Sequence, residues 1–106
     1  MLLLTFRLAS EIQEVVIKGN ELYFSQNGVI TSIEGLRLSQ KGVVKEFPDL
    51  EGKEEWKKEA INRFKEHMKK LETEEKKMNY IKEELTKQGY TALFYQKAGH
   101  RPQKFK

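Results

Sequence analysis

The sequence of 106 residues is of single-domain size and contains no cysteine, which excludes disulfides, thiolate metal sites and cysteine nucleophiles. Charged residues make up 34% of the chain, a composition typical of heat-adapted proteins, and the net charge is a modest +4. No apolar run approaches the roughly 18 residues that a membrane span needs, and no signal peptide is recognisable, so we expect a cytoplasmic protein that meets no membrane.

Residues 1–47 alternate short apolar runs with turn signals, which predicts an antiparallel β-meander of four to six short strands. The expected strands are residues 2–8, 12–18, 21–25, 29–33, 36–39 and 43–47. Gly19-Asn20 and Asn27-Gly28 mark the first hairpin turns after residue 12, because Gly and Asn accept positive φ at low cost.

Residues 22–33 and 36–47 form an internal repeat, in which the second copy begins fourteen residues after the first. Leu, Ser, Gln, Gly and Val recur in register between the two copies. Each copy is expected to fold as a strand, a polar turn closed by Gly, and a second strand. The second copy therefore predicts a hairpin around Lys41-Gly42.

Pro48 ends the expected sheet half, because it lacks an N–H and disfavours helix for the residue before it. Residues 53–89 then show a helical period, with neither Gly nor Pro between Lys53 and Gln88. One apolar stripe at spacings of three and four consists of Trp56, Ala60, Ile61, Phe64, Met68 and Leu71. Glu and Lys fill the opposite face in i,i+4 pairs with the acid first, and each pair stabilises a helix by about 0.2–0.5 kcal/mol.

The number of helices in this segment depends on the residues around Thr73. Thr73 is a suitable N-cap, and Glu74 and Glu75 suit the positive end of a new helix, which favours two helices with a break near Glu72-Thr73. The alternative is one uninterrupted helix whose seven-residue repeat would form a dimer seam. Its members would be Phe64, Leu71, Met78 and Leu85.

The second helix should end at Gly89 in a left-handed conformation, with Tyr90 folding back onto Leu85. Residues 90–96 then form a closing strand, and residues 97–106 form a basic tail. The expected fold is α+β. A single domain would pack an antiparallel β-meander against two amphipathic helices and add a final C-terminal strand.

The apolar helix stripes should face one side of the sheet, with a shift to neighbouring strand residues if the register differs by one. The expected helix contacts are Trp56, Phe64, Met68, Leu71, Ile81 and Leu85. The expected sheet contacts are Phe6, Val16, Phe24, Ile30, Leu38 and Val43. Two helices leave sheet edges or an open face, so a homodimer is expected.

The residues that could carry a function gather in the C-terminal tail, where the sequence from Lys87 onward has cations and no acid. The candidate nucleic-acid-binding residues are Lys97, His100, Arg101, Lys104, Phe105 and Lys106. Cations that contact phosphates, together with a ring that stacks on a base, bind nucleic acid without reading its sequence. This hypothesis would gain support if Arg7, Arg37 or Lys45 joined the tail in one positive surface, whereas a scattered arrangement would favour a protein-interaction module instead.

No catalytic residue, metal-ligand set or cofactor motif is predicted, because the chain has no phosphate-binding loop, no metal-type histidine spacing and no nucleophile motif. His67 lies beside the apolar stripe and is interpreted as a packing residue. The favoured hypothesis is a small non-catalytic binding module that meets RNA or DNA through the tail. The alternative is a protein-interaction or oligomerisation module. A less favoured third hypothesis is an RNase-like enzyme in which His100 and Arg101 act on a phosphodiester.

Overall fold

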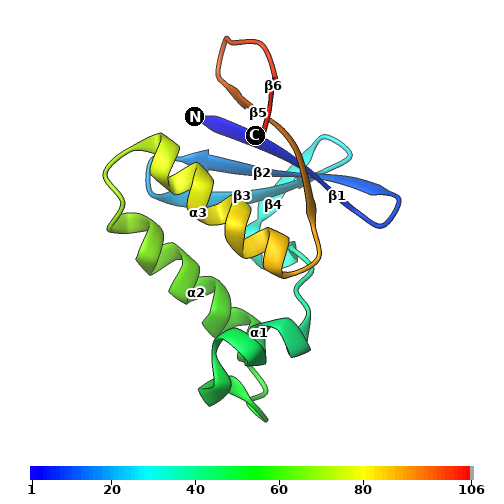
Figure 1. Ribbon diagram of the computed structural model, residues 1–106, viewed down its shortest axis with the longest axis vertical. Coiled ribbons are helices and arrows are strands. Elements are labelled where there is room, and N and C mark those ends of the chain that lie inside the picture. Colours follow the sequence, from blue (N-terminus) through cyan, green and yellow to red (C-terminus); the bar gives the residue numbers. More distant parts are fainter. Residues whose placement is uncertain (106) are drawn as a thin grey trace.

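The computed structural model, which describes residues 1–105, contains one six-stranded antiparallel sheet in the order β4-β3-β2-β1-β5-β6 (Figure 1). The strands are β1 (Leu2–Leu8), β2 (Glu11–Lys18), β3 (Glu21–Gln26), β4 (Val29–Ser32), β5 (Thr91–Lys97) and β6 (Gln103–Lys104). The first four strands are successive hairpins of the predicted meander. β5 returns from the helices to pair with β1, as predicted for the closing strand. The predicted α+β class is confirmed.

The β3–β4 hairpin turns at Asn27 and Gly28, whose φ angles are +54° and +80°. A two-residue turn with positive φ at both positions follows the right-handed twist of its flanking strands. The turn sets a register in which Phe24 opposes Thr31. The strongest hairpin signal in the sequence therefore folds as predicted.

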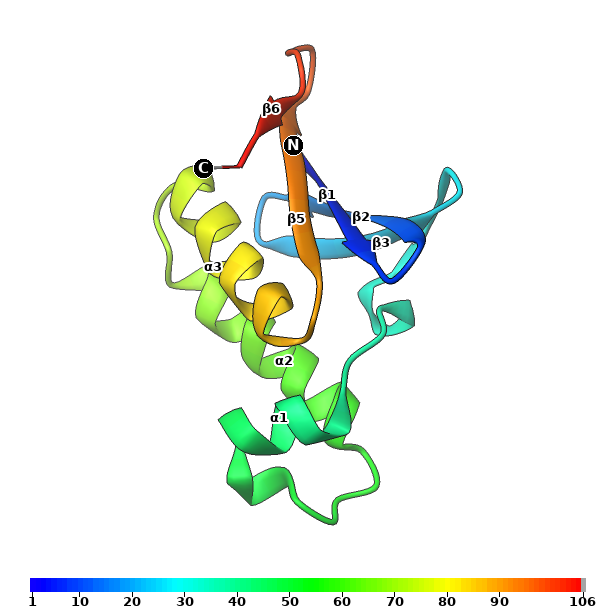
Figure 2. The ribbon, with the colours of Figure 1, turned by 45° about the vertical axis from the view of Figure 1, so that its right-hand side comes forward.

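Helices and short 3-10 turns connect β4 to β5. They are η1 (Ile33–Gly35), α1 (Gln40–Glu46), η2 (Pro48–Leu50), α2 (Trp56–Lys69) and α3 (Glu74–Lys87). α2 and α3 cover one face of the sheet, while α1 lies at the opposite end of the molecule from the β5–β6 hairpin (Figures 1 and 2). Within residues 1–105, none of the helices is both long enough and apolar enough to cross a membrane.

The predicted hairpin in residues 36–47 is wrong, because this copy of the repeat contains α1. Ser39 caps this helix, and its hydroxyl oxygen accepts a hydrogen bond from the Gly42 N–H at 3.2 Å. The two copies differ at the turn, where Lys41 stands at the position of Asn27. Lys adopts positive φ less readily than Asn, so capping by Ser39 prevails over a hairpin turn. The meander consequently ends at Ser32 rather than at residue 47.

Thr73 separates α2 from α3, as predicted. Its hydroxyl oxygen accepts a hydrogen bond from the Lys76 N–H at 3.1 Å. At the other end of α3, Gly89 has φ of +97° and the Tyr90 N–H donates to the Leu85 carbonyl at 3.0 Å. This is the predicted Schellman close. The alternative of one uninterrupted helix is therefore wrong.

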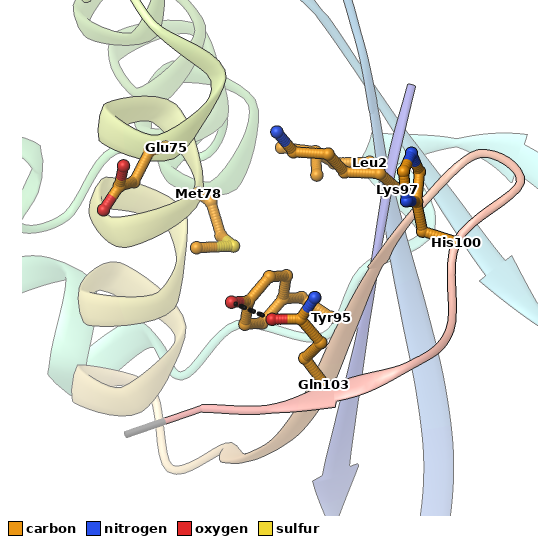
Figure 3. A pocket seen from close by; sticks show the side chains of 7 residues that line it. All are labelled: Leu2, Glu75, Met78, Tyr95, Lys97, His100 and Gln103. Carbon is orange, nitrogen blue, oxygen red and sulfur yellow. Dashed lines mark hydrogen bonds between the residues drawn. The ribbon is translucent and has the colours of Figure 1, made fainter.

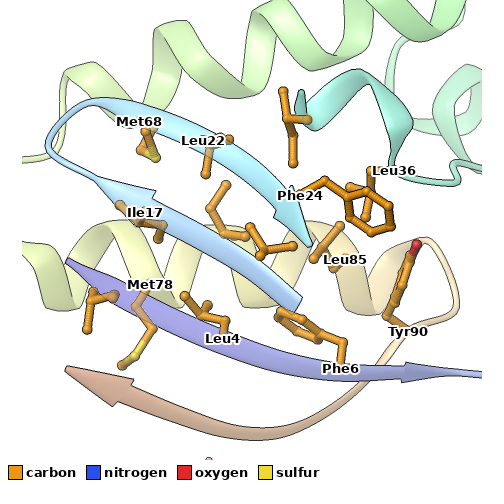
Figure 4. Packing of buried hydrophobic residues seen from close by; sticks show 14 of the residues in the cluster. Leu4, Phe6, Ile17, Leu22, Phe24, Leu36, Met68, Met78, Leu85 and Tyr90 are labelled. Atoms are coloured by element: carbon orange, nitrogen blue, oxygen red, sulfur yellow. The ribbon is translucent and has the colours of Figure 1, made fainter. Parts of the chain in front are cut away.

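The main hydrophobic core lies between the sheet and the helices α2 and α3 (Figure 4). Its sheet side includes Leu2, Leu4, Phe6, Val15, Ile17, Leu22 and Phe24, and its helix side consists of Ile61, Met68, Met78, Ile81 and Leu85. Since side chains alternate along a strand, Val16 lies on the opposite face from Val15 and Ile17, one residue from the expected register. Ile30 was expected to face the helices, but its side chain is 61% exposed.

A second, smaller cluster joins α1 to α2. It consists of Val43, Leu50 and Ala60, and Trp56 packs against it. Trp56 was expected on the helix side and Val43 on the sheet side of the main core, but both belong to this second cluster outside the sheet. The reason is that residues 40–46 form the helix α1 instead of the predicted strand.

Candidate nucleic-acid interface

The C-terminal cations lie on a hairpin rather than on a plain tail. The chain turns at Gly99, where φ is +79°, and returns as β6 to pair with β5. The Ala98 N–H donates to the Met1 carbonyl at 3.1 Å, and the His100 N–H donates to the Lys97 carbonyl at 2.9 Å. These bonds fix the β5–β6 hairpin beside the start of β1, where it projects from the molecule (Figure 2).

Strand alternation divides the β5–β6 hairpin into two faces. Lys97 and Tyr95 oppose core residues of β1, and together with Gln103 they lie on the side of the sheet that carries the helices. Phe94 and Lys104 form a cross-strand pair on the other side. The hairpin therefore presents cations on both faces.

A hollow of about 350 Å³ borders the helix-side face of the hairpin (Figure 3). This hairpin hollow lies between the hairpin, the start of β1 and the first turns of α3. Leu2 and Met78 supply its apolar lining. The polar lining residues are Glu75, Tyr95, Lys97, His100 and Gln103.

Hydrogen bonding fixes the side chain of Gln103 in the hairpin hollow. The Tyr95 hydroxyl donates to Gln103 Oε1 at 2.9 Å. The amide nitrogen of Gln103 is directed toward Lys97 and His100 (Figure 3). Amide and ammonium nitrogens are hydrogen-bond donors, so the hairpin side of the hollow is rich in donors. Glu75, on the α3 side, supplies an acceptor.

The positive charge of the hairpin is not neutralised by ion pairs within the described part of the chain. Lys97, His100, Arg101 and Lys104 are exposed, and none of them forms an ion pair with a described carboxylate. Glu74, next to Glu75 in the sequence, lies 3.7 Å from the amino group of Met1. The hairpin cations therefore remain available to phosphate groups.

Two of the predicted site residues, Lys97 and His100, share the hairpin hollow. Arg101 follows His100 at the exposed tip and is not among the described lining residues. The pair that was expected to act in RNA cleavage is thus not brought together in this hollow. Lys106 was also predicted to contact nucleic acid, but it lies outside the described residues.

Phe105 anchors the end of the hairpin instead of presenting a free ring. Its ring centroid lies 6.0 Å from that of Phe6 and 5.2 Å from that of Tyr95. The Lys82 ammonium lies 5.2 Å from the centroid of the Phe105 ring. The predicted stacking role of Phe105 therefore conflicts with its packing.

Phe94 is the exposed ring of this region, with 39% of its surface accessible, and it lies opposite Lys104. Alternation along β5 was the signal that could have identified it, because an inward Tyr95 requires an outward Phe94.

The wider positive surface that would have supported the nucleic-acid hypothesis is not formed. Arg7 opposes Thr91 at the far end of β5 from the hairpin turn. Arg37 pairs with Glu11 at 3.2 Å, and Lys45 lies on α1 at the other end of the molecule (Figure 1). The candidate surface is therefore confined to the β5–β6 hairpin, which suits a short contact.

His67, the other histidine, stacks on Tyr80 with ring centroids 4.2 Å apart. Among residues 1–105, no group of three or more His, Asp or Glu side chains is arranged to hold a metal ion.

Comparisons with protein-family models, with curated proteins and with solved structures found no match. The function therefore has to be inferred from the geometry of the site.

Proposed function

We propose that this protein is a small non-catalytic module that binds single-stranded nucleic acid through the β5–β6 hairpin. The proposal is supported by a projecting hairpin whose Lys97, Arg101 and Lys104 have no described ion-pair partner. Phosphates bound by these cations would release condensed counterions, which favours association. The exposed ring of Phe94, beside Lys104, could add stacking on one base.

The small size of the positive surface favours a single strand over a duplex. Arg7, Arg37 and Lys45 lie away from the hairpin, so few phosphates can be contacted at once. For single strands the slope of log K against log salt is about −0.7 for each neutralised phosphate. Three or four contacts therefore give an expected slope of roughly −2 to −3.

Fluorescence anisotropy with labelled ten-nucleotide RNA and DNA strands, at several salt concentrations, tests this proposal. The double variant Arg101→Ala/Lys104→Ala should weaken binding and reduce the slope by about 1.4, because two phosphate contacts are lost. The matched control is Lys58→Ala, which removes an exposed lysine from α2 and should leave the slope unchanged. Binding that does not weaken as salt rises would contradict the proposal. Intact RNA after long incubation would also remove the RNase-like hypothesis.

The free edge of β4 favours a second candidate function, self-association. All four residues of β4 are exposed, including Val29 at 62% and Ile30 at 61%. An open strand edge with apolar side chains readily pairs with another strand. The protein could therefore act as a homodimer, with or without a nucleic-acid partner.

A further inference from the structure

The hairpin hollow contains a carboxylate that phosphate binding alone does not explain. Glu75 lines the hollow from the first turn of α3, on the opposite side from Lys97 and His100, and its carboxylate lies over α3, turned away from the hairpin (Figure 3). An ionised carboxylate repels phosphate and can only accept hydrogen bonds. A ligand suited to the hollow would therefore present an anionic group to the hairpin and hydroxyl or amino hydrogens to Glu75, whose exposed side chain would turn toward it.

We infer that this ligand is the 3′-terminal ribonucleotide of an RNA strand, an inference that rests on the single-strand binding proposed above. The last ribose of an RNA carries hydroxyls on adjacent carbons, at the 2′ and 3′ positions. The two oxygens of the Glu75 carboxylate can accept hydrogen bonds from both hydroxyls. An internal ribonucleotide offers only its 2′-hydroxyl, and a DNA end offers only its 3′-hydroxyl.

The other walls of the hairpin hollow match the remaining parts of a nucleotide. Lys97 and His100, on the hairpin side of the hollow, would bind the phosphate that links the last ribose to the strand. The Gln103 amide nitrogen can donate to a base carbonyl, because its own carbonyl already accepts from Tyr95. The volume of about 350 Å³ is near the lower limit of small-molecule sites, about 300–1,000 Å³. One nucleotide fits such a space, whereas a base pair does not.

The first arm of the test varies only the last sugar of the strand. Three 5′-labelled strands of ten uridines end in a ribonucleotide, a 2′-deoxyribonucleotide or a 3′-phosphate, and their affinities are compared by anisotropy at one salt concentration. The unmodified end should bind roughly tenfold more tightly than either modified end, because each modification removes a hydrogen bond to a charged acceptor. Equal, salt-dependent affinities would overturn this inference and leave the proposed function intact. Failure of all three strands to bind would overturn both.

The second arm assigns the discrimination to Glu75. Glu75→Ala should bind the three strands equally, whereas Glu83→Ala should keep the tenfold preference. Glu83 is a matched control, because it is an exposed glutamate on the same helix and does not line the described hollow. Both variants lose one negative charge, so a general rise in affinity should be common to them. If Glu75→Ala retains the preference, the inferred role of Glu75 is overturned.

Discussion

Glu84 is an ionisable residue placed where charge is costly, with only 4% of its surface exposed. Burial raises the pKa of Glu84 to about 7, and a hydrogen bond with the Glu46 carboxyl acts in the same direction. Glu46 Oε2 and Glu84 Oε2 are both buried and have no described donor. A proton on Glu84 supplies the missing donor, because protonated Glu84 can donate to Glu46. The Oε2 atoms of Glu84 and Glu46 can then form a hydrogen bond with each other. The Lys87 ammonium lies 3.3 Å from Oε1 of Glu84 and 3.6 Å from Oε1 of Glu46.

The raised pKa of Glu84 predicts that stability falls as the pH rises. The folded protein keeps this proton up to about pH 7, whereas the unfolded chain releases it near the ordinary pKa of 4.5. The stabilisation is therefore complete below pH 4.5 and lost by about pH 7. Glu84→Gln should be more stable than the wild type by about 1–3 kcal/mol at pH 8, and similar to it at pH 4.5. Urea unfolding at the two pH values measures this difference.

The exposed neighbour Glu83 provides the control for this pH experiment. Glu83→Gln makes the same change on the surface of α3, so its stability difference from the wild type should stay small at both pH values. An equal effect of Glu84→Gln at pH 4.5 and pH 8 would show that Glu84 does not retain its proton in the folded state.

The elements of this fold were predictable from sequence where one local signal determined the backbone. Asn27-Gly28 and Gly89 occupy the left-handed conformations expected of them, and Thr73 caps α3. The prediction failed at residues 36–47, where two local signals competed. Gly42 can close a turn and was interpreted as part of a hairpin, whereas the ability of Ser39 to begin a helix was not recognised. A contact with a residue far along the chain also holds this segment, because Gln88 Oε1 accepts a hydrogen bond from the Ser39 N–H at 3.0 Å.

The close approach of Gln88, the residue that follows α3, makes Gly42 more than a weak helix residue. A Cβ atom at this position would lie 2.9 Å from Gln88 Oε1, the atom that accepts the Ser39 N–H. Gly42→Ala should therefore destabilise the protein by roughly 1 kcal/mol, although alanine favours helix. In the Gln88→Ala background the same substitution should instead stabilise by roughly 0.5–1 kcal/mol, because the clash is gone and the helix propensity remains. Urea unfolding of the wild type, the two single variants and the double variant measures the coupling between the two positions. If Gly42→Ala changed the free energy of unfolding in the same direction in both backgrounds, the proposed clash with Gln88 would be contradicted.

The candidate site was only partly predictable, because its charges are local in sequence and its shape is not. Lys97, His100 and Lys104 could be identified as one cationic segment from sequence alone. The hairpin hollow additionally requires Leu2 and Glu75, which reach it through the pairing of β1 with β5 and the placement of α3. Such contacts between distant parts of the chain depend on register and packing, which local patterns do not specify.

The two edges of the sheet differ in how they resist pairing with another molecule. β6 is two residues long and carries Lys104, and both features discourage edge pairing. β4 is a regular strand, Val-Ile-Thr-Ser, with no charge and no Pro. Two copies of β4 can pair antiparallel about a twofold axis, which gives a closed dimer and leaves both β5–β6 hairpins free. The dimer interface is therefore expected at β4.

A charge on β4 tests this arrangement. Ile30→Lys should shift the protein from dimer to monomer, because edge lysines oppose strand pairing. Ile12→Lys is the control, since Ile12 is also an exposed apolar residue, at 50%, but lies on β2 away from the edge. Multi-angle light scattering over a range of protein concentrations measures the outcome. If both variants dissociate, the interface is the open face of the sheet rather than its edge. A wild type that stays monomeric at the highest concentration would leave β4 without this role.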